Sequence, residues 1–126
     1  MNTIMIVEDD ILFLNTLQYI FGQYGYNTII AKDGKEAAAL IEQEVDIDLL
    51  ITDLMLPFIG GLDLVNKLKT KTSKKIPVIV LSAITNETTV IDSFKLGVDD
   101  YLKKPIIPRE LLIRVDRLLD KHNLLK

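Results

Sequence analysis

Short apolar runs alternate along the chain with longer segments of helical spacing. The runs occupy residues 3–7, 27–31, 47–52, 76–81 and 100–103, and the third and fourth are nearly unbroken stretches of Ile, Val and Leu. Continuous runs of this length are typical of strands buried on both faces of a sheet. We therefore expect five short strands, of which the last, DYLK, has the weakest pattern.

The segments between the runs carry apolar residues three and four positions apart, as amphipathic helices do. Asp10 and Asn86 are placed to cap the first and fourth helices, Gly25 and Gly97 suit their ends, and Pro108 suits the first turn of the fifth. The expected apolar stripes are Leu14, Leu17, Ile20 and Phe21; Ala37, Leu40 and Ile41; Leu62, Val65 and Leu68; Val90, Ile91 and Phe94; and Leu111, Leu112, Val115, Leu118 and Leu119.

Regular alternation of strands and helices predicts one compact α/β domain over residues 1–126, with a parallel sheet, right-handed crossovers and helices on both faces. In open parallel sheets, ligands bind beyond the carboxyl ends of the strands. The residues that follow each strand are therefore the place to look for function.

Composition narrows the classes of function. The chain has no cysteine, which excludes disulfides, thiolate chemistry and cysteine-based metal sites. Its apolar runs are far shorter than the roughly 20 residues that span a bilayer, and its N-terminus lacks the basic region of a signal peptide. We therefore expect a soluble, cytoplasmic protein with no membrane partner.

The net charge of −3 divides unevenly, with −9 in residues 1–63 and +6 in residues 64–126. Five of the basic residues are lysines within 67–75, where no aromatic side chain is interleaved for base stacking. Such a run is usually a solvated helix end and loop. Since no helix-turn-helix or zinc-finger signature accompanies it, we expect no direct nucleic-acid binding.

Acidic side chains follow two of the predicted strands. Glu8, Asp9 and Asp10 follow the first strand, and Asp53 follows the most apolar run. Asp53 stands too far before the next helix to cap it, because a loop with a proline and two glycines intervenes. A carboxylate there can act as a nucleophile, and aspartate is a known acceptor of phosphoryl groups.

If Asp53 lies near Glu8 and Asp9, three carboxylates share one cleft and raise one another's pKa. All-oxygen ligands suit a hard cation such as Mg²⁺, which would neutralise the cluster and shield an incoming phosphoryl group. Lys104 could then pair with Asp53 or a phosphoryl oxygen, and Ser82 offers a hydroxyl. Taken singly, Lys104 would be a surface lysine and Ser82 a turn residue, but together they complete a phosphoryl-transfer site.

The segments EDD, TDLMLP, LSA and KKP occur in the order and spacing of the receiver domain of two-component response regulators, which the chain resembles over essentially its whole length. The resemblance implies a single doubly wound (βα)5 flavodoxin-like domain with a five-stranded parallel sheet in the order 2-1-3-4-5. It also implies a signalling domain that accepts and loses a phosphoryl group and is not a turnover enzyme.

Carried over to this chain, the resemblance makes Asp53 the phosphoacceptor, with a histidine kinase or a histidine phosphotransfer protein as donor. Glu8 and Asp9 match the acidic pair that holds Mg²⁺, and the backbone carbonyl of Met55 matches a further ligand. Glu8 is a common variation on the family's first aspartate and leaves metal binding intact.

The same resemblance assigns the switch. Ser82, in place of the frequent threonine, and Lys104 match the phosphoryl-binding positions, and Tyr101 matches the aromatic switch position. The bond from Lys104 to Pro105 is usually cis in the family, which would aim the lysine into the cleft.

Phosphorylation in the family reshapes the face of the fourth helix, fifth strand and fifth helix, which contacts an output domain or protein. We expect Lys95, Lys103 and Arg109 on or near this face. A phosphorylation-dependent dimer is a further possibility.

Met55 and Ile84 lie two residues after Asp53 and Ser82, where side chains can flank a phosphoryl group. Both are apolar and cannot orient an attacking water, so we expect a fairly long-lived phosphoryl-aspartate.

The main alternative is a Mg²⁺-dependent phosphohydrolase with an aspartate nucleophile. Haloacid-dehalogenase-like enzymes need a second aspartate two positions after the nucleophile, and Met55 occupies that position here. A flavodoxin-like FMN protein would need a first loop rich in Ser, Thr and Gly, where this chain has three acids. Both alternatives are therefore disfavoured.

Overall fold

Strands and helices alternate along the part of the chain that the structure describes. This computed structural model describes residues 2–124, and the side chains of residues 2–120. The strands are β1 (Thr3–Val7), β2 (Asn27–Ala31), β3 (Leu49–Asp53), β4 (Val78–Ser82) and β5 (Asp100–Lys103). The helices are α1 (Ile11–Gln23), α2 (Gly34–Glu42), α3 (Gly61–Lys71), α4 (Glu87–Leu96) and α5 (Pro108–Leu124).

The five strands form one parallel sheet in the order β2-β1-β3-β4-β5, which confirms the expected fold class. Val7 lies opposite Thr52, and Asp53 lies opposite Leu81. Because of this register, the carboxyl ends of β1, β3 and β4 are nearly level. Residues that end these strands therefore meet at one edge of the sheet.

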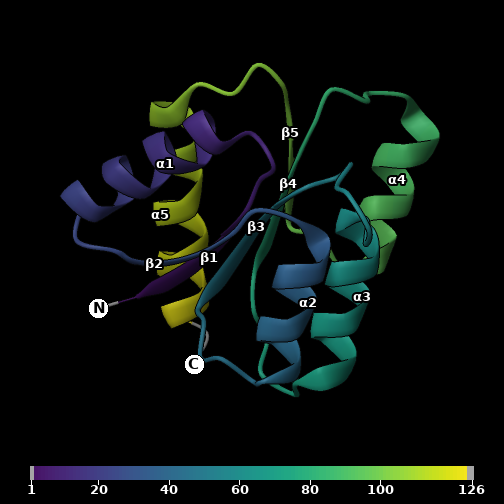
Figure 1. Cartoon of the computed structure of the whole chain (residues 1–126), viewed down its shortest axis with the longest axis horizontal. Coiled ribbons are helices and arrows are strands. Elements are labelled where there is room, and N and C mark those ends of the chain that lie inside the picture. Colours follow the sequence, from purple (N-terminus) through teal and green to yellow (C-terminus); the bar gives the residue numbers. More distant parts are fainter. Residues whose placement is uncertain (1, 125–126) are drawn as a thin grey trace.

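Each face of the sheet has its own apolar core, and successive residues of a strand contribute to opposite cores. In β1, Ile4 and Ile6 pack with α1 and α5, whereas Met5 and Val7 pack with α2 and α3. Figure 1 shows α1 and α5 on one side of the sheet and α2, α3 and α4 on the other. Every residue of β3 and β4 is buried, as the unbroken apolar runs predicted.

The predicted helix boundaries are largely confirmed. The Asp10 side chain accepts a hydrogen bond from the Phe13 amide at 3.2 Å and caps α1. Asn86 caps α4 in the same way, and Gly97 ends that helix at a φ of 111°. These positions are occupied by the residue types that stabilise helix ends, so local sequence alone locates them.

Three details differ from the sequence prediction. β3 and β4 begin at Leu49 and Val78, two residues later than predicted, and in β4 the delay follows from Pro77, which has no amide proton for the ladder. The apolar stripe of α4 does not face the core throughout. Ile91 and Phe94 are 43% and 47% exposed, while Ser93 is the buried residue of this helix.

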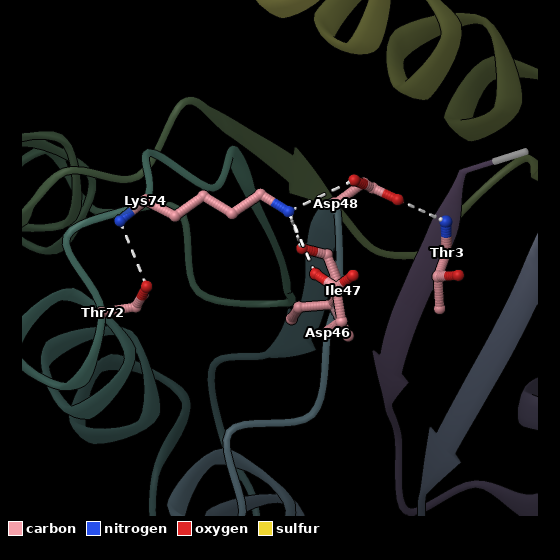
Figure 2. Close-up of polar contacts among 6 residues, drawn as sticks. All are labelled: Thr3, Asp46, Ile47, Asp48, Thr72 and Lys74. Carbon is pink, nitrogen blue, oxygen red and sulfur yellow. Dashed lines mark hydrogen bonds and ion pairs between the residues drawn. The ribbon is translucent and has the colours of Figure 1, made fainter.

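A polar cluster ties together the loops at the amino end of the sheet (Figure 2). The Lys74 ammonium donates to Asp46 Oδ1 at 3.2 Å and to the Ile47 carbonyl at 3.3 Å, and it lies 3.5 Å from Asp48 Oδ1. The second carboxylate oxygen of Asp48 accepts a hydrogen bond from the Thr3 amide at 2.8 Å. We call Lys74, Asp46, Ile47, Asp48 and Thr3 the amino-end cluster; it joins the start of β1 to the loops before β3 and β4.

Candidate functional site

The carboxyl ends of the strands bring the sequence-predicted residues to one edge of the sheet. Glu8 directly follows β1, Asp53 ends β3, Ser82 ends β4 and Lys104 directly follows β5. The ladder continues one step past β3 and β5, because the Leu54 amide donates to the Leu81 carbonyl and the Lys104 amide donates to the Ser82 carbonyl. These backbone hydrogen bonds hold the Cα atoms of the functional residues in place.

Lys104 bridges the two buried carboxylates of the site. Its Nζ lies 2.8 Å from Asp53 Oδ1 and 3.2 Å from Glu8 Oε1. Glu8 is fully buried, and its other oxygen accepts a hydrogen bond from the Asp10 amide at 3.0 Å. Asp53 Oδ1 is buried and, although it is at ion-pair distance from Lys104, it has no hydrogen-bond donor among the described residues. This buried oxygen thus has an ion-pair partner but accepts no hydrogen bond.

The electrostatics of the pair follow from this burial. Burial is the main reason that the pKa of Asp53 is raised, and a hydrogen bond with Glu8 raises it further. Lys104 lowers this pKa, but by less, so it stands at about 8. Burial opposes ionisation of Glu8 too, but the hydrogen bonds from Asp53 and from the Asp10 amide, with the charge of Lys104, hold the pKa of Glu8 below its usual range. Without a metal ion, the surroundings therefore favour the protonated form of Asp53 and the ionised form of Glu8.

The site also contains a cluster of carboxylates that could bind a metal ion. Glu8, Asp9 and Asp53 each offer a carboxylate oxygen, and these oxygens lie within 4.8 Å of one another. Asp9 is exposed at the mouth, whereas the other two are buried at the base. Three carboxylates around a buried oxygen that accepts no hydrogen bond fit a hard divalent cation, whose charge would offset theirs.

Ser82 and Tyr101 both hydrogen bond to one residue of the β4–α4 loop. The Ile84 amide donates to Ser82 Oγ at 2.9 Å, and the Tyr101 hydroxyl donates to the Ile84 carbonyl at 2.5 Å. Ser82 is buried, and the Tyr101 ring is half-buried against the core next to α2 and α3. The Ile84 backbone thus connects the hydroxyl beside the site to the aromatic side chain of β5.

The loop between β3 and α3, residues 54–60, folds tightly over the end of β3. The Gly61 amide donates to the Leu54 carbonyl at 2.9 Å, and a β-carbon at position 61 would collide with the Asp53 carbonyl oxygen. The Ile59 amide donates to the Pro57 carbonyl at 2.9 Å around Phe58, whose φ is 73°. This is the hydrogen-bond pattern of a strained γ-turn, and the Phe58 ring on it is 79% exposed.

Two residues that we expected to flank a phosphoryl group have different surroundings. The side chain of Met55, two residues after Asp53, is 69% exposed. Ile84 is partly buried and packs against the core, so less of its side chain is free to contact a ligand. The peptide bond between Lys104 and Pro105 is cis.

Basic side chains of the second half of the chain fall into two groups. Lys95, Lys103 and Arg109 are exposed on α4, β5 and α5. In the lysine run, Lys67 and Lys71 form ion pairs with Glu42, and Lys74 belongs to the amino-end cluster; Lys69 donates to the Ile76 carbonyl at 3.3 Å. Most lysines of the run therefore make contacts within the domain.

Sequence reasoning placed Glu8, Asp9 and Asp53 in one cleft, and their oxygens do lie together. It did not indicate that Glu8 is fully buried or that it pairs with Lys104. The apolar run that precedes it, IMIV, was the available signal, because a residue directly after a fully buried strand often remains inside.

Comparisons with known proteins agree on one family. The family description "Response regulator receiver domain" matches residues 4–116. The chain is 38% identical over 121 residues to the response regulator SaeR of Staphylococcus aureus, which covers 96% of this chain and 52% of that protein. The chain thus spans about half the length of the curated relatives that it matches.

Solved structures give the same result. The receiver domain of the Francisella response regulator 1452 superposes with a TM-score of 0.87 at 34% identity, over 96% of this chain and 98% of that one. A CheY-like receiver domain protein from Methanospirillum hungatei superposes with a TM-score of 0.92 at 28% identity, over 100% and 99% of the two chains. Across the described residues, we find no helix with both the length and the apolar character to cross a membrane.

Proposed function

Since this chain belongs to the receiver domains of two-component response regulators, we propose that it accepts a phosphoryl group on Asp53 with the help of Mg²⁺. One observation carries the proposal. Asp53 is a buried carboxylate at the end of a central strand, at 2.8 Å from Lys104 and within 4.8 Å of the oxygens of Glu8 and Asp9. A carboxyl group with only a capping or surface role would have no reason to be buried beside a second carboxyl group and a lysine.

The transfer uses the Asp53 carboxylate as nucleophile. One of its oxygens forms a bond to phosphorus while the bond from phosphorus to a donor histidine nitrogen breaks. Lys104 lies close enough to neutralise charge on the phosphoryl oxygens, and the Ser82 hydroxyl could donate to another of these oxygens after it leaves the Ile84 amide. Because burial and Glu8 raise the pKa of Asp53, its carboxyl must be ionised before it attacks.

Mg²⁺ would be held by Glu8, Asp9 and Asp53, with the backbone carbonyl of Met55 as a further ligand. When bound, the ion supplies positive charge that screens the carboxylates and orients the phosphoryl group. The donor set supports a hard cation, because every ligand atom is oxygen and one buried oxygen lacks a donor.

Phosphorylation of Asp53 would change the surface formed by α4, β5 and α5. We propose that Ser82 moves towards the phosphoryl group and thereby releases its bond to the Ile84 amide. The Ile84 carbonyl also accepts the hydrogen bond from the Tyr101 hydroxyl, so a shift of Ile84 would change the position of Tyr101 in β5.

The partners proposed for the domain follow from this scheme. A histidine kinase or histidine phosphotransfer protein supplies the phosphoryl group, and an output domain or protein, or a phosphorylation-dependent dimer, reads the α4-β5-α5 face. Direct nucleic-acid binding by this domain is not part of the proposal, because Glu42, Asp46 and Asp48 neutralise much of the lysine run. A cytoplasmic location fits such partners.

Incubation with acetyl phosphate tests the function. We expect labelling of one equivalent per chain that requires Mg²⁺ and is lost in Asp53→Asn, with mass spectrometry locating the group on Asp53. Asp9→Ala removes an exposed ligand without disturbing the buried pair, and it should abolish Mg²⁺ binding and labelling. Repeated turnover of a phosphoester substrate would instead favour the phosphohydrolase.

The lifetime of the phosphoryl group is a separate part of the proposal. The apolar side chains of Met55 and Ile84 cannot orient water, so autodephosphorylation should be slow. Ile84→Asn should accelerate the decay of the labelled protein, and an unchanged decay rate would refute a role for position 84.

A further inference from the structure

Met55 is chemically distinct from the other residues near the site. The chain has no cysteine, so methionine provides its only sulfur atoms. Met5 is fully buried in the core, whereas Met55 is 69% exposed. Met1, the third methionine, lies outside the described residues. Among the described residues, Met55 is therefore the thioether that a dissolved oxidant can reach.

The position of Met55 places this thioether beside the phosphoacceptor. The Leu54 amide still bonds to the Leu81 carbonyl of β4, and the chain then bends at Leu54 and Met55. The Leu54 side chain is buried in the core next to α2 and α3. Met55 follows Asp53 by two residues, so their Cα atoms lie at most about 7 Å apart, a distance that a methionine side chain can span.

We propose that Met55 is a peroxide-sensitive site, at which oxidation to the sulfoxide shortens the lifetime of the phosphoryl group on Asp53. The inference rests on the proposed function, because it concerns the phosphorylated state. In the reaction, a sulfur lone pair attacks one peroxide oxygen, the O–O bond breaks and an S–O bond forms. The sulfur is oxidised by two electrons, and hydrogen peroxide is reduced to water.

The change in side-chain chemistry explains the shorter lifetime. A thioether is a weak hydrogen-bond acceptor, whereas a sulfoxide has a strongly polar oxygen. Next to Asp53, that oxygen can accept a hydrogen bond from a water molecule and hold it near the phosphorus. The Met55 side chain, which we propose slows hydrolysis while it is apolar, would then assist hydrolysis.

Peptide mapping after limited peroxide treatment gives the first test. Purified chain, treated with hydrogen peroxide and digested, should carry sulfoxide at Met55 well before Met5. The treated and untreated proteins are then labelled with acetyl phosphate and Mg²⁺, the donor is removed, and the decay of the label is followed. We expect decay about fivefold faster after oxidation, the rate equivalent of one hydrogen bond. Methionine sulfoxide reductases should restore the original rate.

Two variants separate the effect of Met55 from other damage. Met55→Leu keeps the size and apolar character of the side chain but cannot be oxidised, so peroxide should leave its decay rate as it was before treatment. Met55→Gln introduces a permanent acceptor and should decay rapidly without peroxide. Circular dichroism before and after treatment checks that the fold is intact.

Any other result contradicts either the peroxide-sensitive site or the proposed function on which it rests. Equal oxidation of Met55 and Met5, a decay rate unaffected by oxidation of Met55, or the same acceleration in Met55→Leu would each contradict the peroxide-sensitive site. Failure of the untreated chain to be labelled on Asp53 would contradict the proposed function itself.

Discussion

At both ends of the sheet, two carboxylates share one lysine. At the carboxyl end, Lys104 lies 2.8 Å and 3.2 Å from the oxygens of Asp53 and Glu8. At the amino end, Lys74 lies 3.2 Å and 3.5 Å from the oxygens of Asp46 and Asp48 (Figure 2). The distances are similar, so geometry alone does not explain why one group has the properties of a reactive site and the other those of a structural one.

Burial distinguishes the two groups. The side chains of Glu8 and Asp53 are 1% and 3% exposed, whereas those of Asp46 and Asp48 are 93% and 24% exposed. In the amino-end cluster, the second oxygen of Asp48 also has a backbone donor, while Asp53 keeps a buried oxygen without one. A lysine shared by two carboxylates thus stabilises the fold where the carboxylates are exposed to water. Where they are buried, the same arrangement leaves them available to bind a ligand.

The largest expected effect is that Asp53→Asn stabilises the protein in the absence of Mg²⁺. The pKa of Asp53 is raised from 3.8 to about 8, so between these values the folded state binds more protons than the unfolded state, and stability falls as pH rises. An uncharged amide avoids this loss. We expect a gain of about 2 kcal/mol in the free energy of unfolding near pH 8, which shrinks towards pH 4.

Urea unfolding from pH 4 to pH 8 measures the gain, and Asp48→Asn is its matched control. Asp48 binds the Thr3 amide and Lys74, so its replacement should destabilise the protein by about 1 kcal/mol. Opposite signs at the two ends support the distinction drawn from burial. A destabilising Asp53→Asn at pH 8 would refute it.

A second difference between the ends concerns backbone strain. Each end carries one non-glycine residue with positive φ: Phe58 at 73° beside the site and Glu44 at 55° in the loop before β3. Phe58→Gly should raise the free energy of unfolding by about 1 kcal/mol, because glycine adopts this φ without steric cost and the exposed ring contributes little packing.

The same unfolding experiment on Glu44→Gly provides the comparison. Glu44 follows the end of α2, where a left-handed residue is common, so its strain is milder and the gain should be smaller. If both substitutions gave the same change, the strain would not be specific to the loop beside Asp53.

The smallest expected effect is at Lys74. Lys74→Met removes two ion pairs that water reaches, since Lys74 and Asp46 are exposed and Asp48 is partly exposed. We therefore expect a loss of about 0.5 kcal/mol in the free energy of unfolding, and less at high salt. Lys75→Met, one residue on, is the control for a general loss of charge. A loss of several kcal/mol at Lys74 would show that the amino-end cluster behaves as a buried group.

Local patterns in the sequence were sufficient for most of the fold. The caps at Asp10 and Asn86, the glycine at 97 and the buried runs of β3 and β4 each depend on near neighbours, so they could be predicted. The orientation of α4 could not be predicted in this way, because its apolar residues do not specify which side of the helix faces the sheet. Only packing against the sheet determines that Ser93 faces inward and Phe94 outward.

Prediction of the site had a similar limit. Strand ends identified Asp53 and Lys104, and the pairing expected between them is present at 2.8 Å. The tie from Lys74 to Asp46 and Asp48 joins residues 28 and 26 positions apart, and no local motif marks it. The raised pKa of Asp53 depends on burial in three dimensions, which residue type alone does not reveal.

The two adjacent glycines before α3 look equivalent in the sequence but should tolerate mutation very differently. A β-carbon at Gly60 would have ordinary contacts, whereas one at Gly61 would strike the Asp53 carbonyl oxygen. In a saturation library selected for phosphorylation, position 60 should therefore accept many residues, and position 61 should return glycine almost exclusively. The identity of one side chain, a single hydrogen atom, thus sets how closely a helix can approach the backbone of the phosphoacceptor.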